Sequence, residues 1–238
     1  MASRLTDFTT RHPWLTMSSV ATVALLLAAF SAAPSIWPDT FPGLHGVKID
    51  TDPENMLDEN EAVRVFHHEM KEALGLHDMV VVGVVNEEHP DGVFNPESLA
   101  RVWELTEFAR GLHGVVEVDL IAPSTVDNIE QAGPGTVRFE WLMAKPPTTR
   151  EASLAVREKA RRIPFLEGTL ISEDGKAVAL YLPLTSKDLS YEIYAQLRER
   201  IEDFDGDERY FVTGLPVAED TFGVEMFKQM AISAPLAM

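Results

Sequence analysis

The uncharged stretch WLTMSSVATVALLLAAFSAAPSI, at residues 14–36, divides the chain into a short head and a long acidic body. No charged side chain occurs between Pro13 and Pro38. A bilayer core requires roughly 20 apolar residues in a helix, because helical hydrogen bonds satisfy the backbone within lipid. The stretch is therefore long enough to cross a membrane.

The residues that flank this stretch predict its orientation. Trp14 and Trp37 bracket it, where aromatic side chains favour the headgroup level, and Arg4 and Arg11 precede it. Basic residues on one side hold that side in the cytoplasm. We therefore expect the N-terminus to be cytoplasmic and everything after residue 38 to lie outside.

A cleaved secretory signal is the competing interpretation of the same stretch. Ser31, Ala32 and Ala33 are small residues of the kind that a signal peptidase accepts. However, the apolar run exceeds the roughly 7–15 residues of a typical signal, and Pro34 would directly follow the cut. A retained anchor is favoured, and both interpretations export the body.

Composition limits what the body can be. About 200 residues follow the anchor, enough for one large domain or two small ones. The chain has a net charge of −18, which repels nucleic acid and anionic headgroups, although solubility alone also explains it. It contains no cysteine, which excludes disulfides and thiolate metal sites. We expect no nucleic-acid partner.

Residues 47–121 show the pattern of strand, helix, strand, helix and strand. Residues 47–50 alternate as a short strand does, and Asp58-x-x-Glu61 predicts a capping box that opens a helix. Residues 79–85, MVVVGVV, predict a strand covered on both faces or buried at a domain contact. The first helix is expected to have Val63, Phe66, Met70 and Leu74 on one face and to end at Gly75.

The second helix of this half begins at Asn95-Pro96, a cap followed by a first-turn proline. Residues 115–121, VVEVDLI, predict the strand that follows it. The buried stripe of the helix is expected to be Leu99, Val102, Trp103, Thr106 and Ala109, with Gly111 or Gly114 closing it.

Residues 132–135, rich in glycine and proline, predict a boundary before a second unit. That unit begins with an alternating strand, 137–143, and a helix capped by Thr148-x-x-Glu151 that runs to about Ile163. Asp-Gly within residues 173–176 predicts a tight hairpin turn between strands at 169–172 and 177–184. A helix at 187–204, with Leu189, Ile193, Leu197 and Ile201 on one side, and a strand at 210–213 complete it.

The predicted fold class is α+β, with one N-terminal transmembrane helix followed by two units that resemble ferredoxin-like split βαβ folds. From Pro216 the pattern continues as one helix, whose last residues, 230–238, are uncharged and mostly apolar. We interpret this end as the start of a second, truncated membrane segment. An amphipathic terminal helix packed on the domain is the alternative.

Candidate metal ligands occur at three places, and each has a simpler structural interpretation. Adjacent helix residues point about 100° apart, so a histidine pair is favoured as a helix face. The candidate calcium loop has its glycine at the wrong position, and the first acidic cluster is typical of a turn. The three groups are His67, His68 and Glu69; Asp203, Asp205 and Asp207; and Asp50, Asp52 and Glu54.

No GxSxG nucleophile elbow or phosphate-binding glycine loop is present, so we do not expect an enzyme. Ser172 and Ser124 lie beside turn residues without a histidine nearby in sequence, and an exported hydrolase is the least supported hypothesis. No catalytic, cofactor-binding or metal-binding residue is assigned, no cofactor is expected, and the substrate-binding residues are unknown.

The order of several segments resembles the first membrane helix and first porter region of the resistance-nodulation-division (RND) superfamily. The resemblance is closest to its MMPL-like hydrophobe exporters and covers nearly the whole chain. The segments are VKIDTDPENML (47–57), DMVVVGVV (78–85), GVVEVDLIAPS (114–124), GTLISEDGKAVALYLPL (168–184) and VTGLPVAEDTF (212–222).

The resemblance implies a proton-driven efflux transporter of hydrophobic or lipid-like substrates in a bacterial inner membrane, with a periplasmic body. Its partners would be the bilayer, the substrate and the remainder of the transporter, and a homo-oligomer is compatible with it. The implied domains are an anchor at 1–38, porter subdomains at 39–131 and 132–215, and a membrane-directed helix at 216–238.

The chain departs from the family by absence: the acidic proton-relay residues of such exporters sit in a later membrane helix, no charged residue occurs between Pro13 and Pro38 here, and the second porter repeat is missing. It is therefore expected to be a fragment unable to transport alone. A self-sufficient, membrane-anchored binding or adaptor domain is the alternative. Substrate would meet side chains between the two units, where Phe139 and Trp141 are candidates, although alternating strand aromatics are more often core.

Overall fold

The computed structural model of the chain describes residues 6, 9–36, 40 and 53–237. Its contacts define two compact units, Met1–Asp50 and Thr51–Met238. The strand predicted at 47–50 lies outside the described residues, as do the candidate ligands Asp50 and Asp52.

The first unit contains α2, a helix from Pro13 to Ile36. Large apolar side chains are exposed all around it, including Leu15, Leu25 and Phe30. A helix that is apolar on every side is stable in an apolar environment, either the core of a protein or a membrane. Residues Pro13–Ser31 make α2 long and apolar enough to cross a membrane, a test that a signal sequence also passes. The prediction of one such helix is confirmed.

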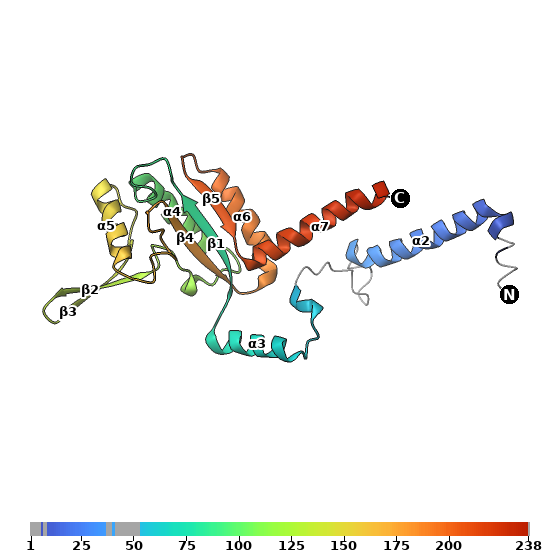
Figure 1. Ribbon diagram of the computed structural model, residues 1–238, viewed down its shortest axis with the longest axis horizontal. Coiled ribbons are helices and arrows are strands. Elements are labelled where there is room, and N and C mark those ends of the chain that lie inside the picture. Colours follow the sequence, from blue (N-terminus) through green and yellow to red (C-terminus); the bar gives the residue numbers. More distant parts are fainter. Residues whose placement is uncertain (1–5, 7–8, 37–39, 41–52, 238) are drawn as a thin grey trace. The chain divides into compact units, whose positions relative to one another are not determined.

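The second unit is built on an antiparallel three-stranded sheet in the order β4–β1–β5 (Figure 1). The central strand is β1, Asp78–Val85, flanked by β4, Ala177–Leu184, and β5, Arg209–Thr213. All three predicted strands are confirmed. Within this chain only one face of β1 is fully buried, because its side chains alternate between buried and half-buried positions, and the alternative of burial at a domain contact stays a prediction.

Two helices cover the inner face of this sheet, and both lie behind it in Figure 1. They are α4, Pro96–Arg110, and α6, Ser190–Glu202, which follows the short 3₁₀ helix η4, Lys187–Leu189. Asn95 caps α4 as predicted, with its side chain accepting from the Ser98 N–H. The fully buried core joins Val80, Val82, Val84, Leu99, Val102, Leu105, Ala109, Leu180, Leu182, Ile193 and Leu197.

The strand predicted at 115–121 is wrong. This segment forms bridges to the free edge of β4 only at its ends, where Val115 bridges Leu184 and Ile121 bridges Tyr181. Between these points it forms the 3₁₀ helix η3, Glu117–Asp119, and Val118 is 88% exposed. The polar residues among its valines leave the edge for solvent, which interrupts the hydrogen-bond ladder.

A hairpin that the sequence analysis did not predict precedes the helix that begins at Arg150. It pairs β2, Asp127–Gly133, with β3, Thr136–Trp141, which confirms the alternating strand. Residues 134–135 form its turn, so the predicted boundary at 132–135 lies at the tip of this hairpin. Because β1 pairs with both β4 and β5, one sheet combines strands from both sides of that turn. The division into two subdomains after residue 131 stays a prediction.

The predicted helix after the hairpin is α5, Arg150–Arg161, and its cap is Thr149 rather than Thr148. The Asp-Gly turn is confirmed, since Asp174 accepts from the Lys176 N–H and Gly175 has a φ of 75°. Residues 169–172 are not a full strand. They meet β4 through one isolated bridge, Ile171 to Val178.

The helix predicted after residue 58 is α3, Ala62–Leu74, and it ends at Gly75 in the left-handed conformation as expected. The capping box is wrong, because Glu61 is the cap residue and forms no side-chain cap hydrogen bond. Asp58 instead accepts from the Asn60 N–H, an Asx turn that competes with capping. The predicted apolar face is real but includes no buried residue.

The last helix, α7, runs without a break from Leu215 to Ala237, as predicted. Met230 and Ile232 are exposed near its end. Within the described residues only α2 is long and apolar enough to span a membrane. The interpretation of the end of α7 as a second membrane segment stays a prediction.

Replacing Gly214 with alanine is expected to lower the free energy of unfolding by about 1–3 kcal/mol. Gly214 has a φ of 134°, and an added Cβ would lie 2.3 Å from the Met79 carbonyl oxygen of β1. Urea unfolding of the full chain measures the loss. Gly111→Ala is the matched control, because Gly111 is right-handed and its added Cβ meets nothing closer than 3.4 Å. Equal losses would contradict this account.

Candidate functional site

The sheet face turned away from α4 and α6, which we name the outer face, is the candidate site. Cross-strand pairing arranges it in rows, and the middle row is Ala179, Gly83 and Phe211. The rows on either side are Tyr181, Val81 and Thr213, and Ala177, Val85 and Arg209. The middle row is entirely apolar, and its largest side chain, Phe211, is 52% exposed.

A groove of about 560 Å³ opens over the middle row of the outer face. Gly83 and Ala179 contribute almost no side-chain volume there, so the sheet surface is hollow between its neighbours. The volume lies in the range of about 300–1,000 Å³ that small-molecule sites occupy. The groove is lined by Gly83, Gly168, Thr169, Leu170, Ile171, Ser172, Glu173, Asp174, Ala177, Val178 and Ala179.

A second groove, of about 350 Å³, opens at the other end of β1. Met79 of the outer face lines it together with Val118 and Ile121, whose side chains the interrupted edge segment leaves exposed. His77 and Asp119 face each other there, with Nε2 and Oδ2 3.5 Å apart. Because residues 115–121 do not form a continuous strand, Val118 and Ile121 stay exposed and form part of an apolar surface.

The turn at the end of the larger groove carries negative charge. Asp174 accepts hydrogen bonds from the Ser172 hydroxyl and the Lys176 N–H, and these hold the pKa of its carboxyl below the usual value. The guanidinium groups of Arg157 and Arg161 donate to the main-chain carbonyls of Asp174 and Glu173. The Asp174 carboxylate is therefore ionised at neutral pH.

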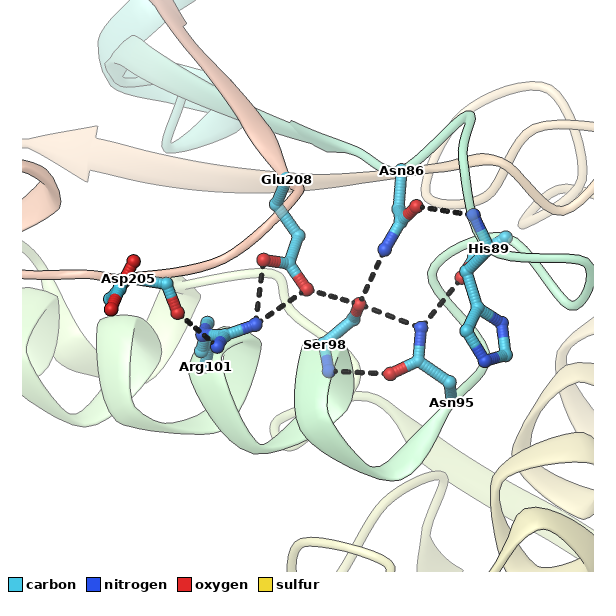
Figure 2. A network of polar contacts seen from close by, with 8 residues as sticks. Asn86, His89, Asn95, Ser98, Arg101, Asp205 and Glu208 are labelled. Carbon is cyan, nitrogen blue, oxygen red and sulfur yellow. Dashed lines mark hydrogen bonds and ion pairs between the residues drawn. The ribbon is translucent and has the colours of Figure 1, made fainter.

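A buried polar network lies under the other side of the sheet (Figure 2). Ser98 of α4 is at its centre, donating to Glu208 and accepting from the side-chain amides of Asn86 and Asn95. Arg101 donates to both Glu208 carboxylate oxygens, at 2.8 and 2.7 Å. The network joins the end of β1, the first turn of α4 and the residue that precedes β5.

The network stabilises the packing of β1, α4 and the start of β5, since Ser98 is fully buried and the Glu208 side chain is 2% exposed. Burial raises the pKa of the Glu208 carboxyl, but hydrogen bonds from Ser98 and from its own backbone N–H, and the charge of Arg101, outweigh it. The pKa therefore lies below the usual value, and Glu208 is ionised in the fold. The sequence analysis found the cap residue Asn95 but missed the pairing of Ser98 with Glu208, because these two residues lie far apart in the chain.

The predicted metal candidates do not converge in the described residues. No group of three or more histidine, cysteine, aspartate or glutamate side chains in that part of the chain could hold a metal ion. His67 and His68 both approach Glu54, at 3.4 and 3.9 Å. Asp203 caps α6, and the Asp205 carbonyl accepts from Arg101, consistent with a helix-terminal turn.

The two serine candidates are also accounted for by local structure. Ser172 donates to Asp174 Oδ1 at 2.7 Å and stabilises the hairpin turn. Ser124 is buried, and its hydroxyl has no hydrogen-bond partner in the described part of the chain. The expectation that the chain is not an enzyme stays untested.

The aromatic candidates Phe139 and Trp141 are 72% and 49% exposed on the β2–β3 hairpin, so their interpretation as core is wrong. They lie on one hairpin face with Ile129, which pairs directly with Phe139. The opposite face is held toward α5 by ion pairs from Lys159 to Glu140 and from Arg162 to Glu130.

Comparisons with known proteins add no assignment to this geometry. No protein-family model matches the chain, and no curated protein matches it.

Proposed function

We propose that the chain is the N-terminal anchor and extracytoplasmic porter part of a proton-driven exporter of the RND superfamily, in its MMPL-like branch. Its substrates would be hydrophobic or lipid-like. The observation that carries the proposal is the outer face, an apolar sheet surface with two grooves on a body that follows a membrane-compatible helix. A soluble domain usually buries or covers such a surface.

The topology of the second unit supports a porter fold in a simpler form than two subdomains. The order β1, α4, the edge segment at 115–121, β4, α6 and β5 is the order of a split βαβ fold, with both helices on one face. The hairpin and α5 are then an insertion between its second and third strands. We infer one ferredoxin-like porter unit here in place of two.

The energy source for transport must come from elsewhere, because the span lacks the ionisable group that a proton relay needs. The chain would then supply the anchor and the surface that meets the substrate. The alternative, a self-sufficient anchored binding module, uses the same surface without a pump.

The intact mass of the natural gene product separates the two. We expect a mass far above the 26.4 kDa of this chain, with further apolar spans and an acidic residue inside one of them. A natural product of 26.4 kDa would overturn the exporter and leave the binding module.

Single cysteines placed on the two sides of α2 test the proposed orientation, since the chain has no cysteine of its own. Val137→Cys, exposed on the hairpin, should react with a membrane-impermeant maleimide in intact cells. Thr10→Cys, exposed in the head, should react only after lysis. The reverse pattern would contradict an extracytoplasmic body, and loss of residue 10 from the mature protein would indicate a cleaved signal.

A further inference from the structure

The outer edge of β5 is an open edge of the sheet (Figure 1). The strand order β4–β1–β5 makes β4 and β5 the two edge strands. Other segments protect the edge of β4, through bridges from Val115, Ile121 and Ile171. Within the described part of the chain no segment pairs with the outer edge of β5. An unprotected edge strand presents main-chain groups that can pair with a strand of another chain.

The hydrogen-bond pattern of the sheet determines which groups face this edge. Tyr181 and Ile121 exchange main-chain hydrogen bonds, so the odd-numbered residues of β4 bond away from β1. The even-numbered residues of β4 pair with even-numbered residues of β1, which leaves the odd-numbered residues of β1 to bond β5. Phe211 pairs with one of these and therefore bonds inward. The N–H and carbonyl groups of Tyr210 and Val212 consequently point to the open edge.

We propose that two copies of the chain pair through β5, antiparallel and in a register centred on Phe211. Each Tyr210 then lies opposite Val212 of the second copy, and the two residues exchange both of their edge-facing hydrogen bonds. This register pairs all five residues of the strand with the five of its copy and joins the two sheets into one. The inference does not depend on transport.

The side chains of β5 suit this pairing. Phe211 is 52% exposed, and the register sets it directly opposite its own copy, at the close spacing of a pair without mutual hydrogen bonds. Aromatic cross-strand pairs are among the favourable ones. Arg209 lies opposite Thr213 of the second copy, so like charges do not face each other, and Arg209 is already paired with Glu87. The strand is therefore complementary to itself.

The surroundings of β5 leave room for a second strand. The strand RYFVT contains no proline or lysine and pairs with β1 without a bulge, so it lacks devices that usually protect an edge. The chain after β5 turns back over the sheet, since an added Cβ at Gly214 would lie 2.3 Å from the Met79 carbonyl oxygen. Helix α7 then contacts α6 and β1 more than β5.

The short strand gives a weak contact in dilute solution, and an anchor strengthens it. A chain held in a membrane by α2 meets other copies at a raised effective concentration. The dimer is therefore expected in membranes that contain the full chain, and it is tested there.

Single cysteines test the register, because the chain has no cysteine of its own. In membranes from cells that make the full chain, Phe211→Cys should form a disulfide-linked dimer on oxidation with copper phenanthroline. Opposite residues of such a pair have Cα atoms about 4.5 Å apart, within disulfide range. Cross-linking should be at least about tenfold slower for Arg209→Cys or Thr213→Cys, because each lies about 14 Å from its own copy.

The matched positive control combines these two slow variants. Arg209→Cys and Thr213→Cys, made together in one membrane, should cross-link to each other, since the proposed register sets the two positions opposite. Equal cross-linking at all three single positions would show random collision and overturn the proposal. Absence of a dimer for Phe211→Cys would overturn it as well.

Val212→Pro tests the hydrogen bonds of the edge. The Val212 N–H points away from β1, so proline removes no hydrogen bond of the sheet but takes two from the symmetric dimer. Added to Phe211→Cys, it should slow cross-linking about tenfold. Circular dichroism checks that the double variant is folded.

Unchanged cross-linking in the folded proline variant would overturn pairing through this edge. If that variant does not fold, the comparison of cysteines at positions 209, 211 and 213 decides. The readout is a covalent dimer and not transport. A chain that passes the mass and orientation tests but forms no dimer would therefore lose only this inference, and a dimer would stand if the exporter were overturned.

Discussion

Replacing Arg101 with methionine is expected to lower the free energy of unfolding by about 3–5 kcal/mol, the cost of breaking a buried ion pair from one side. Methionine keeps much of the apolar stem but leaves the Glu208 carboxylate, 2% exposed, without its guanidinium partner. Ser98 would still donate to the Glu208 carboxylate, and the two asparagines would still donate to Ser98, but none of these side chains carries a charge. Urea unfolding of the full chain measures the change.

The matched control for this prediction is Arg209→Met. Arg209 also pairs with a glutamate, Glu87, but both side chains are more than half exposed, at 59% and 55%. An exposed pair contributes about 0–1 kcal/mol, so this variant should be nearly neutral. Equal losses in the two variants would show that Glu208 is not an uncompensated buried charge when Arg101 is absent.

The pH dependence of the same variant has a definite sign. In the native protein the pKa of Glu208 is depressed, so the stability that it contributes is present above the unfolded pKa and is lost as pH falls through the folded pKa. Without Arg101, burial raises the pKa of Glu208, and protonation of its carboxylate removes the free-energy cost of a buried, unpaired charge. The difference between native chain and variant should therefore shrink as pH is lowered from 7 toward the usual pKa of glutamate, about 4.3.

Local sequence patterns predicted the parts of the fold whose cause is local. Asn95 caps α4 through its own side chain, and Gly75 ends α3 because it adopts a left-handed φ. Both effects act within a few residues. The strands β1, β4 and β5 were found because their apolar runs are bounded by turn residues.

Features that depend on distant contacts could not be predicted in the same way. The strand β2, DNIEQAG, has no apolar alternation of its own and forms only by pairing with β3. The continuous apolar run of β1 fits coverage on one face or on two, so it could not reveal the outer face. Ser98 and Glu208 meet across a sequence separation of 110 residues.

Replacing Leu26 with arginine is expected to remove the chain from the membrane fraction. Leu26 lies near the middle of α2, and a central arginine costs about 2.5–3.5 kcal/mol of insertion free energy. That cost lowers the ratio of inserted to uninserted chain about a hundredfold. Extraction of membranes with alkaline carbonate measures it, since only an inserted helix stays in the pellet.

Leu26→Val is the control, because it keeps an apolar side chain at the same depth and should stay in the pellet. The experiment also separates the anchor from a cleaved signal. A retained anchor keeps the native chain in the pellet with residue 26 present, and only the arginine variant leaves it. A signal would instead release the native body with a new N-terminus at Pro34, and arginine would then block export rather than anchoring. The outer face would then belong to a body released from the membrane. Such a body still offers a surface for a hydrophobic substrate, but no anchor holds it beside a pump.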